Sequence, residues 1–196
     1  MKTLLTLIVM LLLAAGVQAG DPLKIDEHDG IPPSTIRFDI PGTIDTSDPT
    51  WHRWRGVDYY QVSLDCNLTM TYEYASDPYY DAYCVQVSNT DPIQIWTAPI
   101  AGQFDTVLYL YCDAFDPANS TQNCITVDDD NGDGLLSFIG LVTTVTLQPG
   151  ENYWLVICGY SPNSLGNYLI QTSDNVALCS VPVEELGWGA LKNLFR

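Results

Sequence analysis

Apolar and polar residues alternate along most of the chain after residue 35, with the two-residue period of a strand that has one buried face. Leu68–Tyr74 alternates without a break, and Tyr83–Ser88 continues the pattern. Val107–Tyr111 and Tyr153–Cys158 are instead continuous apolar runs, which is typical of central strands buried on both faces or packed under loops. Further strands are predicted at Thr35–Ile44, Asp58–Leu64, Ile93–Thr97, Gln122–Val127, Leu141–Leu147 and Asn167–Thr172.

Pro and Gly residues separate these segments, and no helical period appears between them. We therefore expect an all-β fold, an antiparallel jelly-roll-like β-sandwich over residues 35–181. The polar segment 20–34 is predicted to be a linker. Residues 182–196 predict a short C-terminal helix, because Trp188, Leu191 and Phe195 fall on one helical face and acids precede bases. This tail either packs on the sandwich or serves in sorting or docking.

The first 19 residues predict a secretory signal peptide that is cleaved after Ala19. A charged start, an apolar middle and a small-residue end are all present. An uncleaved membrane helix is the alternative, but the apolar run is shorter than the roughly 20 residues needed to cross a bilayer. We expect a protein that is secreted or at the cell surface, in an extracellular or periplasmic space, and not integral to the membrane after cleavage.

Six cysteines lie in the predicted mature chain, and an even count in an oxidising compartment predicts three disulfides. Pairing between sequence neighbours is favoured, because each pair then lies near one hairpin or connection. Cys112 and Cys124 flank a turn-rich segment. Cys66 with Cys84 requires a bulge, because the two cysteines differ in their alternation with apolar neighbours. The remaining cysteines are Cys158 and Cys179.

Acidic residues outnumber basic residues by 24 to 7, and no Lys, Arg or His lies between Arg55 and Lys192. This balance repels nucleic acid and anionic lipid. Carboxylates without basic partners stay solvated, accept hydrogen bonds or bind cations. Much of the acidic surface therefore serves solubility, and a cation site is the alternative where several carboxylates converge.

The segment from Asp128 to Ser137 is the strongest candidate for such a site. Asp129, Asn131 and Asp133, followed by Gly134, match the start of a calcium loop, in which alternate residues turn oxygen ligands toward one centre. Gly140 stands where an EF-hand needs a Glu. A Ca²⁺ ion would then need further ligands, and the predicted set is Asp128, Asp129, Asn131, Asp133, Ser137, Asp113 and Asp116. A plain surface turn is the other interpretation.

Aromatic residues form a second candidate site. Four tyrosines and two tryptophans flank loops that could bind sugar rings or an extended polypeptide: Tyr74, Tyr79, Tyr80, Tyr83, Trp51 and Trp54. Packing at the edge of the core is the alternative. Arg53 and Arg55 lie beside the two tryptophans, and cation–π stacking would account for them.

No pattern in the sequence predicts an enzyme. The predicted mature chain holds two histidines, both ahead of the main strands, and it lacks the serine-nucleophile and zinc-helix motifs. No spacing selects a pair of carboxylates for glycoside hydrolysis. A non-catalytic protein is therefore expected.

Four segments read F-D-T-V-L-Y-L-Y at 104–111, V-D-D-D-N-G-D-G-L-L-S at 127–137, L-Q-P-G-E-N-Y-W-L-V-I at 147–157 and G-N-Y at 166–168. Through these segments the chain resembles the bacterial pre-peptidase C-terminal domain over roughly residues 36–173. The resemblance implies a secreted β-sandwich that accompanies proteases and other exported proteins without catalysis of its own. Relatives that bind collagen through exposed tyrosines allow a similar use here.

Two functions follow from these observations. The first is a secreted accessory or binding module that engages a polysaccharide or a protein through surface loops, with Ca²⁺ as the candidate stabilising ion. The second is a structural protein of the cell surface or matrix that is attached through its C-terminal tail. Residues 188–196 resemble tails that end some exported bacterial proteins.

Overall fold

The computed structural model describes residues 38–56, 62–66 and 72–179, apart from the side chains of residues 54–56 and 72–75. The predicted signal peptide, the linker and the C-terminal helix lie outside the described residues. Within the described part of the chain, no helix is long and apolar enough to cross a bilayer.

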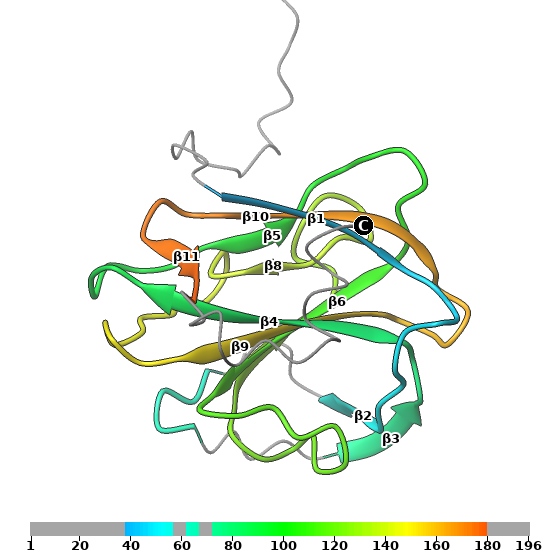
Figure 1. The fold of residues 1–196 in the computed structure, drawn as a ribbon, viewed down its shortest axis with the longest axis horizontal. Helices are drawn as coiled ribbons and strands as arrows, with labels where there is room; N and C mark the ends of the chain where they lie inside the picture. The colour runs from blue at the N-terminus through cyan, green and yellow to red at the C-terminus, as the bar shows by residue number, and fades with distance from the viewer. Residues whose placement is uncertain (1–37, 57–61, 67–71, 180–196) are drawn as a thin grey trace, which may run out of the picture. The chain divides into compact units, whose positions relative to one another are not determined.

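Two antiparallel sheets pack against each other, and a short hairpin lies beside the second sheet (Figure 1). The first sheet has the order β1 (Phe38–Ile44), β10 (Gly166–Thr172), β5 (Ile95–Thr97) and β8 (Phe138–Ile139). The second has the order β11 (Val176–Leu178), β4 (Tyr80–Val87), β9 (Tyr153–Gly159), β6 (Thr106–Cys112) and β7 (Cys124–Asp128). The hairpin pairs β2 (Arg53–Gly56) with β3 (Tyr72–Ser76). The predicted all-β sandwich is confirmed.

The main core fills the space between the two sheets. Alternate residues of strands in the first sheet supply it, such as Ile40 and Ile44 from β1 and Ile170 from β10. The second sheet contributes Leu108 and Leu155, both fully buried. This packing explains the alternating sequence pattern, because a strand at the side of a sandwich buries one face and exposes the other.

The central strands of the second sheet are buried on both faces. All seven residues of β6 are buried, and so are six of the seven residues of β9. Leu108 and Leu110 point into the main core. Their neighbours point the other way, into an outer cluster of eight buried residues: Trp51, Val107, Tyr109, Tyr111, Cys124, Val127, Val156 and Cys158. The continuous apolar runs therefore correspond to strands covered on both sides, as predicted.

Some predicted strands differ from those observed. Leu141–Leu147 forms no strand, and Val145 makes only an isolated bridge to Ile93, whose amide donates to the Val145 carbonyl at 2.9 Å. Asp58–Leu64 falls partly outside the described residues, and its described end lies in a turn. Strands β2, β8 and β11 were not predicted, because each has only two to four residues. Such segments are too short to show a period.

A tyrosine on β10 requires a glycine on β1. Gly42 and Tyr168 are directly paired, and the Tyr168 ring occupies the place where a side chain at residue 42 would lie. The ring cannot move aside easily, because it is 2% exposed and its hydroxyl donates to Asp81 at 2.6 Å. The same hydroxyl is hydrogen-bonded to that of Tyr83. These bonds connect the first sheet to the second across the core.

Two disulfides connect distant parts of the described chain. Cys66 pairs with Cys112, with a Cα–Cα distance of 5.8 Å, and Cys84 pairs with Cys179 at 5.3 Å. The paired residues are 46 and 95 positions apart. Loops of that size correspond to roughly 4 and 5 kcal/mol of stabilisation in the chain-entropy treatment.

The predicted pairing of sequence neighbours is wrong. Cys112 points into the main core and Cys124 into the outer cluster, so the two side chains lie on opposite faces of one sheet. Cys158 and Cys124 are both free and buried. They lie on opposite sides of β6, next to Val107 and Tyr111, which are four residues apart along that strand. That displacement alone is about 13 Å, well beyond the roughly 7 Å limit for bridging two cysteines.

Thiol counting should distinguish two disulfides from three. In the native oxidised protein, we expect no thiol to react with an aromatic disulfide reagent, because both free thiols are fully buried. After unfolding in denaturant without reductant, two thiols per chain should react. A count of zero after unfolding would restore the three predicted disulfides. Peptide mapping of the alkylated protein should place the label on Cys124 and Cys158.

Candidate functional site

The aromatic residues predicted to bind a ligand are largely used in packing. Trp51 is 2% exposed and forms the centre of the outer cluster. Its ring centroid lies 4.9 Å from that of Tyr109 and 5.2 Å from that of Phe115, both in edge-on geometry. Tyr80 packs on the same cluster, with its ring 5.3 Å from Phe115. In this arrangement the rings of Trp51 and Tyr80 stabilise the sheet.

The other aromatic residues predicted to bind a ligand either pack against the main core or have side chains that the structure does not describe. Tyr79 and Tyr83 are half-buried and pack against the main core. Burial raises the pKa of Tyr83 to about 12. The side chains of Tyr74 and Trp54 lie outside what the structure describes. Of the four rings that the structure describes, those of Trp51 and Tyr80 belong to the outer cluster and those of Tyr79 and Tyr83 pack against the main core, so these four do not form one surface.

Arg53 is a buried cation at the start of β2. Its side chain is 1% exposed, and one guanidinium nitrogen donates to the Tyr160 carbonyl at 2.7 Å. The guanidinium carbon lies 5.4 Å from the centroid of the Tyr160 ring. The expected cation–π contact is thus made with Tyr160, a residue that the sequence pattern did not single out.

Asp128 holds the acidic turn together. Its carboxylate accepts hydrogen bonds from the Phe138 amide at 2.6 Å and from the Asn131 amide at 3.3 Å, and it also accepts one from the Asn131 side chain. Burial raises the pKa of Asp128, and these hydrogen bonds act in the opposite direction. Both carboxylate oxygens are engaged within the turn, so Asp128 has a structural role there.

The structure does not bring the predicted calcium ligands together. Asp133 is exposed, whereas Ser137 is fully buried and donates to the Thr106 carbonyl at 2.7 Å. Asp113 and Asp116 follow the far end of β6, whereas the acidic turn lies near its start. The seven residues of β6 separate these two groups by roughly 20 Å.

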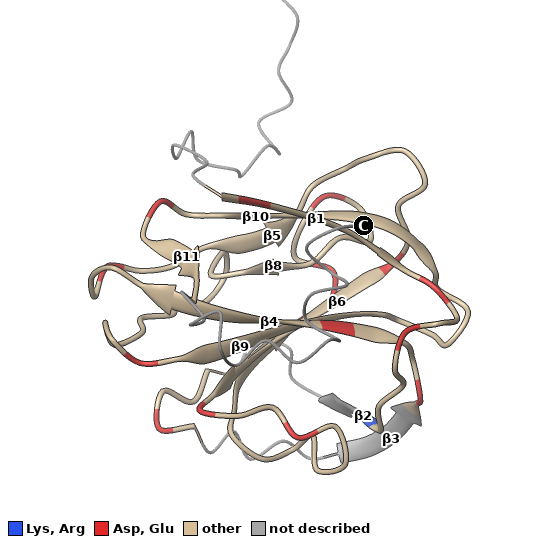
Figure 2. Cartoon of the chain, in the orientation of Figure 1, with Lys and Arg blue, Asp and Glu red and all other residues tan. Residues whose placement is uncertain are grey.

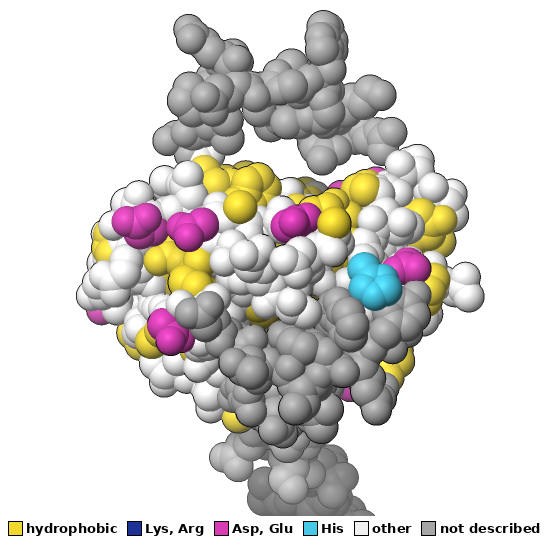
Figure 3. Space-filling model, turned by 90° about the horizontal axis from the view of Figure 1, so that it is seen from below, with side chains coloured by type: hydrophobic (Ala, Val, Ile, Leu, Met, Phe, Trp, Pro, Cys, Tyr) yellow, Lys and Arg dark blue, Asp and Glu magenta, His cyan; other side chains and the backbone are white. Residues whose placement is uncertain are grey.

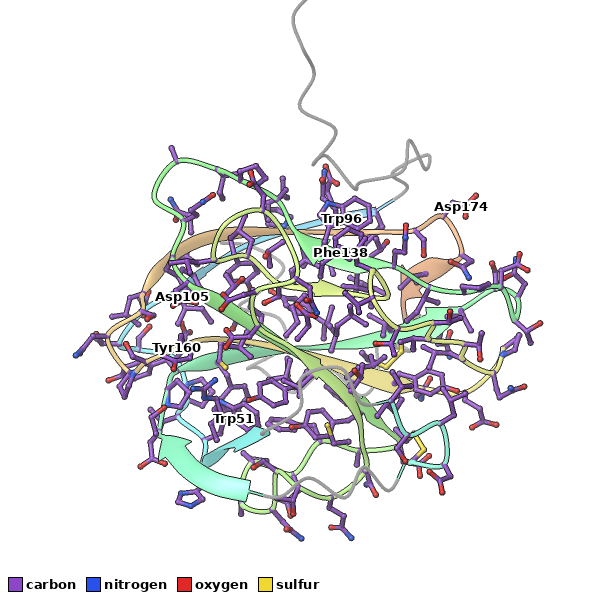
Figure 4. The ribbon with its side chains drawn as sticks, turned by 180° about the vertical axis from the view of Figure 1, so that it is seen from behind. Trp51, Trp96, Asp105, Phe138, Tyr160 and Asp174 are labelled. Atoms are coloured by element: carbon purple, nitrogen blue, oxygen red, sulfur yellow. A yellow bond between two sulfur atoms is a disulfide. The ribbon has the colours of Figure 1, made fainter. Side chains whose placement is uncertain are left out.

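A different set of carboxylates does converge. Oxygen atoms of Asp105, Asp129 and Asp130 lie within 4.8 Å of one another, and we call these residues the carboxylate triad. Asp105 precedes β6, and the other two begin the acidic turn after β7. Figure 4 shows Asp105, Tyr160 and Trp51 one after another along one side of the sandwich. Sequence spacing missed Asp105, because only the pairing of β6 with β7 brings it beside the turn.

The negative charge of the carboxylate triad is partly balanced by the positive charge of Arg53. Burial, followed by repulsion from Asp130, raises the pKa of Asp105, while Arg53 lowers it. One carboxylate oxygen of Asp105 is buried and makes no hydrogen bond within the described part of the chain. Carboxylates in this arrangement could hold a hard cation such as Ca²⁺, although six to eight oxygen ligands are needed for a complete shell.

The two free thiols, Cys124 and Cys158, are expected to be unreactive in the folded protein. Burial raises the pKa of Cys124 to about 12 and that of Cys158 to about 12. Both side chains are completely inaccessible. A thiol attacks or binds metal as the thiolate, so neither group is suited to that chemistry at neutral pH.

A cleft of about 280 Å³ lies at the far end of β6 from the carboxylate triad. Leu64, Ile125 and Leu147 line it, together with the Cys66–Cys112 disulfide. Polar side chains lie on the same cleft: Asp113, Thr146, Gln148, Glu151 and Asn152. Leu64 is 56% exposed, so this apolar residue stands open to solvent at the cleft.

Left-handed backbone conformations gather beside this cleft. Among the described residues, three that are not glycine have positive φ: Cys66 at 62°, Asp113 at 52° and Asn123 at 63°. Cys66 is bonded to the neighbour of Asp113, and the Cys112 amide donates to the Asn123 carbonyl at 2.9 Å. Such conformations are uncommon and often occur at functional sites. No signal in the sequence marked this corner, because it is assembled by a long-range disulfide.

Charge is distributed unevenly over the described residues. Figure 2 shows acidic residues in loops all around the sandwich and on strands such as β1 and β4, whereas the described Lys and Arg residues are confined to β2. His52 pairs with Asp77 at 3.2 Å on the surface near that strand. Both candidate sites, the carboxylate triad and the cleft, are therefore acidic.

Neither a protein-family model nor a curated protein matches the chain. The resemblance to the pre-peptidase C-terminal domain accordingly stays an expectation from the sequence motifs.

The raised pKa of Asp105 predicts a pH-dependent stability. A carboxyl group whose pKa is higher in the folded state favours folding when it is protonated. Its ionisation therefore lowers the free energy of unfolding as the pH rises through the pKa of the unfolded state and then that of the folded state. We expect the free energy of unfolding of Asp105→Asn, measured relative to that of the wild type, to be higher at pH 7 than at pH 3. Urea unfolding at both pH values measures this. Asp133→Asn, an exposed acid of the same turn, is the control; an equal gain there would show that net charge alone is responsible.

Proposed function

We propose that the chain is a secreted, non-catalytic binding module that engages a polysaccharide or a protein at the cleft beside the Cys66–Cys112 disulfide. The observation that carries this proposal is the cleft itself, where an exposed leucine, polar side chains and left-handed residues meet. Ligand sites commonly combine an apolar lining with a few fixed polar groups. The volume of about 280 Å³ lies just below the usual range of about 300 to 1,000 Å³, which leaves room for one sugar unit or one side chain of a larger ligand.

The two disulfides support export. Disulfides persist in oxidising compartments and are rare in the reducing cytosol. Both bonds connect residues that are far apart in sequence, so each is an important part of the stabilisation. The predicted signal peptide agrees with this location.

Buried thiols and packed aromatic rings support a role without catalysis. The described cysteines that are not in disulfides have raised pKa values and no access to solvent. Asp128 and Ser137, which stood among the predicted site residues, are engaged in hydrogen bonds that hold the acidic turn and the core. These groups serve the fold.

We further propose that Ca²⁺ stabilises the domain, with the carboxylate triad in place of the ligand set predicted from the sequence. The unbonded oxygen of Asp105 and the mutual approach of the three carboxylates favour a cation. Arg53 lowers the affinity, because it already supplies a positive charge nearby. We therefore expect a dissociation constant in the range of extracellular modules, about 10⁻⁴ to 10⁻³ M.

Calcium should raise the unfolding temperature of the oxidised protein relative to the same protein with chelator. At a Ca²⁺ concentration tenfold above the dissociation constant, the gain is about 1.4 kcal/mol. This corresponds to roughly 3 to 6 °C for a domain of this size. Asp130→Asn should reduce the shift, whereas Asp133→Asn should leave it unchanged. No shift at 10 mM Ca²⁺ would contradict the calcium proposal.

A matched pair of surface variants tests the binding function. Leu64 lines the cleft and is 56% exposed, whereas Val142 is 57% exposed and does not line it. The mature protein would be assayed for retention on immobilised polysaccharides and extracellular proteins. We expect Leu64→Ala to weaken retention by about tenfold, the effect of losing a contact of about 1.4 kcal/mol, and Val142→Ala to retain the ligand. Equal behaviour of the two variants would place the binding surface elsewhere.

The structural protein attached through its tail remains the second candidate. The Cys84–Cys179 disulfide favours it, because this bond fixes the last described residue to β4, immediately before the undescribed segment 180–196. Deleting residues 184–196 separates the two functions. If the truncated protein loses surface attachment but still retains its ligand, the tail anchors a binding module. If attachment is lost and neither the full-length nor the truncated protein retains any ligand, the structural role is favoured.

A further inference from the structure

The cleft is negatively charged. Asp113 and Glu151 both line it, and none of its described lining residues carries a positive charge. Arg53, a basic residue with a described side chain, is 1% exposed and donates to the Tyr160 carbonyl away from the cleft lining. On the face shown in Figure 3, acidic side chains lie among neutral and apolar ones, and no Lys or Arg is visible among the coloured residues. A concave acidic surface concentrates cations by focusing the electrostatic field.

Part of the cleft lining is apolar. Leu64, which is 56% exposed, lines the cleft together with the buried Ile125 and Leu147 and the Cys66–Cys112 disulfide. A ligand that fits both parts carries an apolar stem and a cationic head. Lys and Arg side chains have this form, since they bury an aliphatic stem while the charged group stays in contact with polar surroundings. The cavity volume of about 280 Å³ suits one such side chain.

The cleft is held in shape before any ligand arrives. Asp113 is fixed by its left-handed backbone, by the disulfide of its neighbour Cys112, and by the Trp154 indole nitrogen, which donates to the Asp113 carbonyl at 3.0 Å. Elsewhere in the lining, the Gln148 amide donates to the Tyr153 hydroxyl at 2.9 Å, and the Glu151 amide donates to the Gln148 carbonyl. Preorganisation of this kind reduces the entropy lost on binding.

From these observations we infer that the cleft binds a lysine or arginine side chain of a partner protein. The inference rests on the proposed binding function and gives its ligand a chemical class. Asp113 and Glu151 attract the cationic head, and the exposed Leu64 contacts the stem. Neutral sugars would use the same polar groups as hydrogen-bond partners, but they would not use the charge.

Isotope-labelled protein titrated with two short acetylated peptides tests this inference. One peptide carries a single central lysine, and in the other that lysine is Nε-acetylated. We expect the lysine peptide to shift the amide resonances of Asp113 and Glu151, and the acetylated peptide to leave them in place. Raising the salt concentration should weaken the interaction, because screening reduces the attraction between exposed charges.

Charge-neutral variants with a matched control complete the test. Asp113→Asn keeps a residue type that tolerates positive φ, and Glu151→Gln keeps the side-chain shape. Each should weaken binding by about two- to fivefold, the usual contribution of an exposed ion pair. Asp133→Asn removes the same charge at the opposite end of β6 and should have no effect. Equal effects of all three variants would overturn the inference.

The outcomes separate this inference from the binding function. Equal binding of the acetylated peptide would show that charge is not recognised. If a neutral polysaccharide shifts the same resonances and the lysine peptide does not, the ligand class is wrong and the binding function stands. If neither peptide nor any polysaccharide or protein of the panel moves them, both proposals are wrong.

Discussion

Burial of the central strands on both faces is the constraint on which the rest of the structure depends. β6 and β9 are apolar along almost their whole length, so one opposing sheet cannot cover them. The first sheet covers one face, and Trp51 and the half-buried Phe115 help to cover the other. The outer face of the second sheet carries five buried aliphatic and aromatic residues, namely Val107, Tyr109, Tyr111, Val127 and Val156. Leaving them in water would cost roughly 1.5 to 3 kcal/mol for each large side chain. The segment that leads into β2 is therefore needed by the fold, and its Trp51 is buried, as is Arg53 at the start of the strand.

The same constraint decides which cysteines can meet. Successive residues of a strand point to opposite faces, so a cysteine in β6 and one in β7 are partners only when their alternation agrees. Cys112 lies on the main-core side, and it meets Cys66 from a segment that runs beside β7, where the Ser63 amide donates to the Ile125 carbonyl at 2.8 Å. Cys124 and Cys158 lie on the other side and act as small apolar residues. Proximity in sequence was the wrong guide, because the side of the sheet matters more than the length of the connection.

Long strands were predictable from the sequence, and the sites were not. β1, β6, β9 and β10 follow apolar patterns that cover most of their length, and their type and approximate bounds match the prediction. The acidic turn was recognised, but its alternating spacing suggested a ligand set that the fold does not assemble. Asp128 is consumed by hydrogen bonds within the turn, while Asp105 arrives from another strand. The cleft depends on a disulfide between residues 46 positions apart, and no local pattern reports such a contact.

The two disulfides also overlap along the chain, since Cys84 lies between Cys66 and Cys112, and Cys112 lies between Cys84 and Cys179. A single break in the backbone anywhere between residues 66 and 179 consequently leaves both fragments covalently joined by at least one bond. The covalent rings together enclose β3 to β11. A protease that nicks one exposed loop between residues 66 and 179 would therefore cut the polypeptide without releasing β3 to β11, and the strands on either side of the cut would stay at high effective concentration for one another.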